Sequence, residues 1–185
     1  MPTALHLRYT SNVLGFRFAA SILVAATVLV AADPKPSDLT LVDLSGKKVR
    51  LRDYRGKIVV LNFWATWCGP CREEMPMIVE AEKAWGPKGV TFIAISLDDS
   101  KTRKNIPEFI ERYHVGFPVW SGALADDLDR LHMGQGVPDT GFLDEAGVVV
   151  ARVLGETHRD EIDERLAWLT GDRKSPPPPA LINHF

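Results

Sequence analysis

The chain has 185 residues, enough for one domain with its own hydrophobic core, and 45% of them are hydrophobic. Its formal net charge is −2 and it carries no long basic run, so the composition gives no support to nucleic-acid binding. A domain of this size needs no disulfide as a staple, so its two cysteines are candidates for chemistry rather than for scaffolding.

The first 32 residues predict a targeting segment. Arg8 and Arg17 precede a mainly apolar run over residues 18–32, which is shorter than the roughly 20 residues of a spanning helix. Val30-Ala31-Ala32 resembles a signal-peptidase site. We expect residues 1–32 to be a signal peptide, with an uncleaved N-terminal anchor as the alternative. Both put the rest of the chain outside the cytoplasm, either in the periplasm or secreted, and only an uncleaved N-terminus would attach it to the membrane.

Residues 33–37 are expected to be a linker to one folded domain over residues 38–170. Apolar runs rich in β-branched residues predict strands, and apolar residues at helical spacing predict helices. The expected elements are a hairpin at 39–51, a strand at 58–63, a helix to 85, a strand at 90–95, helices near 106–113 and 124–131, a hairpin at 142–154 and a helix near 162–169. This order predicts an α/β fold with a mixed central sheet flanked by helices.

Beyond residue 170 the composition changes. Ser175 is followed by four consecutive prolines, and proline-rich segments have few ways to build a packed core. We therefore predict that residues 171–185 form a disordered or extended tail.

The most informative motif is Trp67-Cys68-Gly69-Pro70-Cys71, which contains both cysteines. It lies where the first buried strand ends and a helix begins, and a helix N-terminus favours the thiolate of Cys68. Cys71 is one helical turn further on, within reach of a disulfide. Pro70 fits the first turn because it has no N–H to lose, and Gly69 lets another backbone approach closely. We expect Cys68 to attack a substrate disulfide and Cys71 to resolve the mixed disulfide.

Two other uses of these cysteines fit less well. A zinc site needs about four ligands, and the histidines show no ligand-like spacing around the two thiols, so no metal is expected. A structural disulfide this short stabilises little through loop entropy. The redox-active Cys68–Cys71 pair is therefore expected to work without a cofactor.

The residues around the cysteines resemble those of a known family. The stretch 62–71, followed by Pro76, resembles the thioredoxin superfamily. The stretch 51–57 and the presequence narrow the resemblance to the TlpA/ResA group of extracytoplasmic thiol-disulfide oxidoreductases. Residues 136–140 resemble the cis-proline loop of that group. The resemblance spans residues 39–169 and implies a thioredoxin fold with an N-terminal β-hairpin extension.

The resemblance also implies a substrate surface. The Val137–Pro138 bond should be cis and should lie beside the cysteines, where the backbone of Val137 can pair with a substrate strand. Trp67 should flank the sulfurs on the surface. The expected substrate-binding residues are thus Trp67, Gly69, Pro70, Val137 and Pro138.

One departure from the superfamily concerns the acid that serves the buried thiol. Cytoplasmic thioredoxins have a buried aspartate where this chain has Asn62, which cannot accept a proton from Cys71. In ResA-like proteins an acid near the active site follows the next strand, and the matching position here is Asp99. We expect Asp99 to assist proton transfer. The alternative is that Asp98 or Asp99 only solvates a loop or caps the next helix.

These features predict a protein-disulfide reductase that acts on disulfide-containing client proteins, in cell redox homeostasis and for instance in cytochrome c maturation. Its electrons would come from a membrane thiol-transporting donor. A disulfide oxidant and a non-catalytic thioredoxin-like binding module are the alternatives. A copper carrier of this fold usually has a CxxxC motif and a peroxidase has a lone attacking cysteine, so both fit less well.

Overall fold

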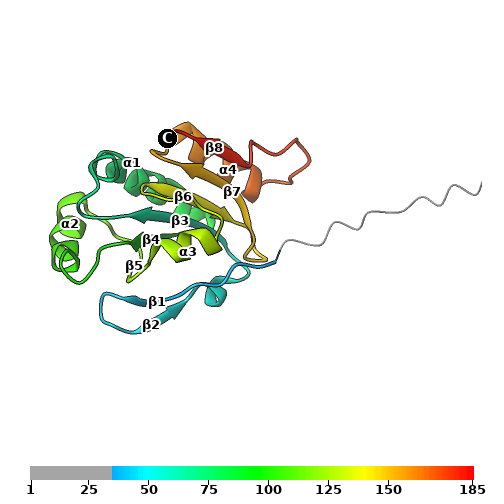
Figure 1. The fold of residues 1–185 in the computed structure, drawn as a ribbon. Helices are drawn as coiled ribbons and strands as arrows, with labels where there is room; N and C mark the ends of the chain where they lie inside the picture. Colours follow the sequence, from blue (N-terminus) through cyan, green and yellow to red (C-terminus); the bar gives the residue numbers. More distant parts are fainter. Residues whose placement is uncertain (1–34) are drawn as a thin grey trace, which may run out of the picture. The chain divides into compact units, whose positions relative to one another are not determined.

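The structure is a computed structural model that describes residues 35–185, so the expected targeting segment at 1–32 lies outside the described residues. These described residues form a mixed sheet of eight strands in the order β2-β1-β5-β4-β3-β6-β7-β8 (Figure 1). The strands are β1 (Thr40–Asp43), β2 (Lys48–Arg50), β3 (Ile58–Trp64), β4 (Val90–Ser96), β5 (Val119–Ser121), β6 (Asp139–Leu143), β7 (Val149–Leu154) and β8 (Leu181–Asn183). The helices are α1 (Gly69–Trp85), α2 (Ile106–Tyr113), α3 (Ala125–Arg130) and α4 (Arg159–Thr170).

Strand β3 is the centre of the sheet. It runs parallel to β4 and antiparallel to β6, and all seven of its residues are buried. Alternate side chains of a strand point to opposite faces, so Val60 and Trp64 pack in the core with α1, α2 and α4, whereas Leu61 and Phe63 pack with α3 and the N-terminal hairpin. This burial on both faces explains the near-continuous apolar sequence of β3. Because Trp64, the last residue of β3, is buried, the strand end that leads to Cys68 is held in the core.

The expected N-terminal hairpin is present and belongs to the main sheet. Strands β1 and β2 pair antiparallel, and β1 then pairs antiparallel with β5. The sequence analysis did not anticipate β5, because its three residues are too few to show a period. The mixed sheet flanked by helices, with this hairpin as an extension, agrees with the expected architecture.

The tail at 171–185, which we expected to be disordered or extended, includes an ordered extended segment. Residues Leu181–Asn183 form β8, which pairs parallel with β7. Arg165 in α4 is 1% exposed and donates one hydrogen bond to the Pro179 carbonyl at 2.9 Å and another to the Glu161 carbonyl at 2.9 Å. Backbone pairing and this buried guanidinium thus supply the ordering that the tail's own apolar residues cannot.

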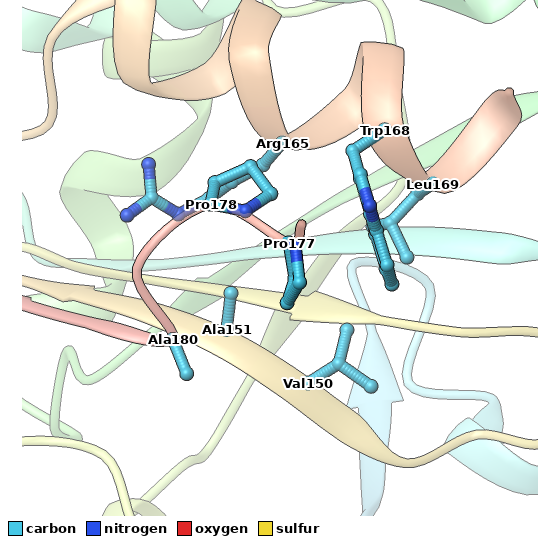
Figure 2. A pocket seen from close by; sticks show the side chains of 8 residues that line it. All are labelled: Val150, Ala151, Arg165, Trp168, Leu169, Pro177, Pro178 and Ala180. Carbon is cyan, nitrogen blue, oxygen red and sulfur yellow. The ribbon is translucent and has the colours of Figure 1, made fainter. Parts of the chain in front are cut away.

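The proline segment of the tail lies next to β7 and α4 and lines a pocket with them. Figure 2 shows Pro177 between Trp168 of α4 and Val150 of β7, and Pro178 next to Arg165 of α4. The pocket between them, which is partly open to solvent, has a volume of about 320 Å³ and an almost wholly apolar lining. Over residues 35–185, no helix is both long enough and apolar enough to cross a membrane.

Candidate active site

The two cysteines form a disulfide at the N-terminus of α1. Cys68 is the N-cap residue of the helix, and its Sγ accepts a hydrogen bond from the Cys71 backbone N–H at 3.2 Å. Cys68 is 5% exposed and Cys71 is fully buried. In the reduced protein the same N–H and the helix dipole favour a thiolate on Cys68. The pair is therefore asymmetric, with an outer sulfur at the helix end and an inner sulfur in the core.

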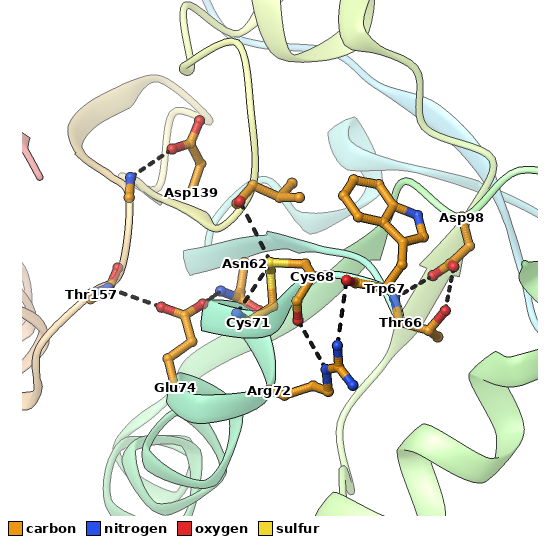
Figure 3. Close-up of a disulfide and its surroundings, with 12 residues drawn as sticks. Asn62, Thr66, Trp67, Cys68, Cys71, Arg72, Glu74, Asp98, Asp139 and Thr157 are labelled. Carbon is orange, nitrogen blue, oxygen red and sulfur yellow. Dashed lines mark hydrogen bonds between the residues drawn. A yellow bond between two sulfur atoms is a disulfide. The ribbon is translucent and has the colours of Figure 1, made fainter. Parts of the chain in front are cut away.

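The cis-proline loop faces the outer cysteine. The Val137–Pro138 bond is cis, as the resemblance implied. The Val137 carbonyl oxygen lies 3.5 Å from Cys68 Sγ, and Figure 3 shows the loop beside the disulfide. Val137 is half-buried and Pro138 is buried. A polypeptide that reaches Cys68 from solvent thus meets the backbone of Val137 at the same place.

Behind the inner cysteine lies a buried carboxyl group, that of Glu74. Its side chain is on α1, three residues after Cys71, the spacing that places two residues on one helix face. Glu74 is 2% exposed. Its Oε1 accepts a hydrogen bond from Asn62 Nδ2 at 2.7 Å and its Oε2 accepts one from the Thr157 backbone N–H at 2.9 Å (Figure 3). Burial raises the pKa of Glu74 to about 7. This carboxyl group can therefore hold or release a proton near neutral pH.

Glu74 was not predicted as a site residue from the sequence, since a glutamate beside Glu73 and Arg72 looks like part of a solvated helix face. One signal was available. Glu74 stands beside Met75 and three residues after Cys71, so it falls on the helix face that the apolar residues define. Asn62 indeed replaces the buried aspartate of thioredoxins, and it contacts a carboxylate that a different element supplies.

The expected proton-transfer role of Asp99 gains no support from its hydrogen bonds. Its side chain is exposed and accepts hydrogen bonds from the backbone N–H groups of Lys101 and Thr102 at 2.8 and 3.0 Å, which lower its pKa. These contacts order its own loop.

The neighbouring carboxylate, that of Asp98, is the one turned inward. Asp98 is 1% exposed and accepts hydrogen bonds from the Thr66 backbone N–H at 2.9 Å and from the Thr66 hydroxyl at 2.6 Å. The Ser96 hydroxyl donates a third at 2.9 Å. Thr66 belongs to the turn between β3 and Cys68, so Asp98 fixes the approach of the chain to the outer cysteine.

A further buried carboxyl group, that of Asp139, follows Pro138 directly. It accepts hydrogen bonds from the backbone N–H groups of Gly134 at 2.6 Å and Gly155 at 3.0 Å. Burial raises the pKa of Asp139 to about 6. A Cβ on Gly134 would lie 2.6 Å from Asp139 Oδ2, so glycine is needed there. Asp139 thus ties the cis-proline loop to the loop before it and to the end of β7.

The aromatic and basic residues around the cysteines have different environments. Trp67 is 56% exposed beside Cys68, as expected, while Trp64 is buried and packs on Phe109 with ring centroids 4.1 Å apart. Arg72 folds back so that its guanidinium donates to the Cys68 carbonyl at 3.3 Å. Within residues 35–185, no group of histidine, cysteine and carboxylate side chains is arranged to hold a metal ion.

The comparisons with known proteins agree with this geometry. The AhpC/TSA family matches residues 32–152. The thiol-disulfide oxidoreductase ResA of Geobacillus thermodenitrificans is 34% identical over 156 residues, which cover 83% of this chain and 86% of that protein. The thioredoxin-like protein YneN of Bacillus subtilis is 35% identical over 70% of this chain and 75% of its own.

Solved structures show the same likeness. A thiol:disulfide interchange protein of the thioredoxin family from Chlorobium tepidum superposes with a TM-score of 0.64 and 26% identity, over 76% of this chain and 99% of that one. A secreted Mycobacterium tuberculosis disulfide oxidoreductase homologous to E. coli DsbE gives 0.58 and 26%, over 71% and 96%. These matches confirm the thioredoxin fold and the CxxC chemistry. The chain therefore belongs to the thioredoxin-like AhpC/TSA family, within it to the thiol-disulfide oxidoreductases that include ResA.

Proposed function

We propose that this oxidoreductase works as a reductase of client-protein disulfides outside the cytoplasm, with Cys68 as the attacking thiol and Cys71 as the resolving thiol. The observation that carries the proposal is the asymmetry of the pair. Cys68 caps a helix N-terminus and borders the Val137 backbone, whereas Cys71 is fully buried on the helix face that bears Glu74. Only the outer sulfur is placed to meet a client, and only the inner one has a proton acceptor on its helix face.

The reaction proceeds by two exchanges of sulfur bonds. The Cys68 thiolate attacks one sulfur of the client disulfide, that disulfide breaks, and one client thiolate leaves. The Cys71 thiolate then attacks Cys68 Sγ, which releases the second client thiolate and leaves the Cys68–Cys71 disulfide. The client gains two electrons and, once its thiolates are protonated, two protons. The same two electrons leave the protein's dithiol.

Glu74 takes the proton of Cys71 in the second exchange. A thiol attacks only as the thiolate, and a buried thiol is hard to deprotonate without a base. With a pKa of about 7, the Glu74 carboxyl is partly ionised near neutral pH, which is the condition that suits a general base. The hydrogen bonds from Asn62 and Thr157 hold it in position.

The pair must be reduced again after each turnover. Outside the cytoplasm the reductant we propose is a membrane thiol-transporting protein that exchanges its own dithiol for the Cys68–Cys71 disulfide, with no other cofactor in this chain. One relative is described as secreted, and the presequence favours the same compartment. Oxidised apocytochrome c, which must be reduced before haem attachment, is the first client class to test.

The decisive experiment is the reduction potential. The mature protein is equilibrated in dithiothreitol or glutathione buffers of known potential, and its free thiols are counted by alkylation. A value near that of thioredoxin, about −270 mV, supports the reductase, and a value near that of DsbA, about −120 mV, reverses the proposed direction. A Cys68→Ser, Cys71→Ser double variant is the control, because it has no couple. If the wild type also shows no reversible couple, the proposal is wrong.

A further inference from the structure

The groove beside the cysteines is bounded by two parts of the chain that are far apart in sequence. Pro70 of the motif and Val137 and Pro138 of the cis-proline loop line it, and so do His184 and Phe185 of the tail. The groove has a volume of about 350 Å³. The tail therefore contributes to a groove that also includes Val137, whose carbonyl oxygen lies 3.5 Å from Cys68 Sγ.

The tail is held firmly at this place by its backbone. The His184 N–H donates to the Leu154 carbonyl at 2.8 Å, and the Arg152 N–H donates to the Ala180 carbonyl at 2.8 Å, so β8 is bonded to β7 at both ends. Gly155 lies directly under His184, and a Cβ on it would come within 3.0 Å of the His184 Cβ. Together with the buried Arg165 described above, these contacts fix where the last two residues lie.

The side chains of these two residues have different environments. The His184 ring stacks on that of His158 with centroids 5.1 Å apart, and its Nε2 lies 2.9 Å from Glu161 Oε1. Phe185 is 70% exposed. Its Cζ lies 3.8 Å from where a Cβ of Gly136 would be, so the ring reaches the loop that carries Val137. The ring of His184 is thus held by His158 and Glu161, whereas the neighbouring Phe185 is an exposed aromatic at the groove.

We propose that Phe185 is a specificity-determining residue, forming the outer apolar wall of the groove that receives the client segment around the attacked cysteine. The inference rests on the proposed function and names its preferred client: an extended segment with a large apolar side chain next to its cysteine. Such a segment pairs with the Val137 backbone and turns alternate side chains to opposite sides. The lining of the groove as a whole is mixed, with Glu156 and two histidines among its residues, but Pro70, Pro138 and Phe185 are apolar. One side chain of the client segment packs against these three residues.

The test uses short peptides whose cysteine carries a 2-nitro-5-thiobenzoate mixed disulfide, so that attack by Cys68 releases a coloured thiolate. Two peptides are compared, identical except that the cysteine is flanked by leucines or by serines, together with hydroxyethyl disulfide as a substrate without flanking residues. The second-order rate constants of the reduced full chain are measured for the wild type, Phe185→Ala and Phe185→Leu. Leu181→Ala is the matched control, because Leu181 is also an exposed apolar residue of the tail but does not line the groove.

The wild type should prefer the leucine peptide. Phe185→Ala should lower that preference by about three- to tenfold, since a partly exposed apolar contact is lost, and Phe185→Leu should keep most of it. Leu181→Ala should match the wild type, and all variants should react equally with hydroxyethyl disulfide.

Three outcomes would overturn the inference alone: no flanking preference in the wild type, no change of preference in Phe185→Ala, or an equal change with hydroxyethyl disulfide. A faster reaction of Phe185→Ala would also overturn it, because the ring would then obstruct clients. A wild type that reacts with no disulfide at all would instead contradict the proposed function, and this inference with it.

Discussion

The inner and outer sides of the active site are built differently. The inner side, made of Asn62, Cys71 and Glu74, comes from β3 and α1, and none of its residues is more than 2% exposed. The outer side is made of Trp67, Pro70, Val137 and Phe185, and apart from Pro70 in the first turn of α1 these residues come from a turn, a loop and the tail. Under the two proposals above, proton transfer depends on the buried core, whereas client choice depends mainly on segments that can vary without disturbing that core.

The largest effects should come from replacing each of the two cysteines separately by serine. Cys68→Ser should lose turnover by on the order of a thousandfold or more, because it removes the nucleophile. Cys71→Ser should still attack clients but accumulate mixed disulfides through Cys68, visible on non-reducing gels and by mass spectrometry. If Cys68→Ser accumulates them instead, the inner and outer assignments are reversed.

The next largest effect should come from Glu74→Gln, which removes the proton acceptor on the inner side. We expect the resolution step to slow by about a hundredfold and to lose its dependence on a group of pKa about 7. The attack step should change little. Single-turnover release of client from the mixed disulfide, followed between pH 5.5 and 8.5, measures this. Glu73→Gln is the matched control, as Glu73 is the exposed neighbour, and equal behaviour of the two variants would remove Glu74 from the mechanism.

The buried carboxyl groups should also make the free energy of unfolding depend on pH. The pKa of Glu74 is raised from 4.5 to about 7 and that of Asp139 from 3.8 to about 6, in both cases mainly by burial. Between the ordinary and the raised pKa of each group, the native state therefore binds more protons than the unfolded state. The free energy of unfolding should fall as pH rises through these two ranges, from 4.5 to about 7 for Glu74 and from 3.8 to about 6 for Asp139. Glu74→Gln should reduce this fall by roughly 3 kcal/mol at most. Urea unfolding of the oxidised wild type and of oxidised Glu74→Gln, each at pH 4.5 and 7.5, provides the measurement. If the free energy of unfolding falls by the same amount between these pH values in both proteins, the prediction is wrong.

The last comparison, which includes the smallest expected effect, distinguishes two adjacent carboxylates. Asp98→Ala should destabilise the protein by about 2 to 4 kcal/mol, because it leaves buried donors of Thr66 and Ser96 without an acceptor, and it should loosen the turn before Cys68. Asp99→Ala should change stability by only about 0.5 kcal/mol and should leave both exchange steps unchanged. Thermal unfolding and the two single-turnover rates separate them. A catalytic loss in Asp99→Ala with normal folding would restore its expected role.

The sequence predicted those parts of the molecule that local patterns determine. The CxxC motif, the strand before it and the helices are visible because spacing and composition are local signals. Strands β5 and β8 have three residues each, too few for a period, and they form because neighbouring strands offer backbone partners. No local signal says which of Asp98 and Asp99 turns inward, since Thr66 and Ser96 decide this through the fold. For Glu74 the helix spacing gave a local signal of burial, but its partners Asn62 and Thr157 come from distant parts of the chain and could not be predicted from it.

Strand β8 has one more consequence, for the solubility of the protein. An uncovered edge strand presents free N–H and C=O groups to which another chain can add, and this promotes aggregation. The opposite edge is the short strand β2, which carries Lys48 and Arg50, charges that discourage such pairing. Strand β7 has six residues, and the tail pairs with the last three of them, Arg152 to Leu154. The tail that contributes to the groove thus also covers half of the outer edge of a longer strand and limits its self-association.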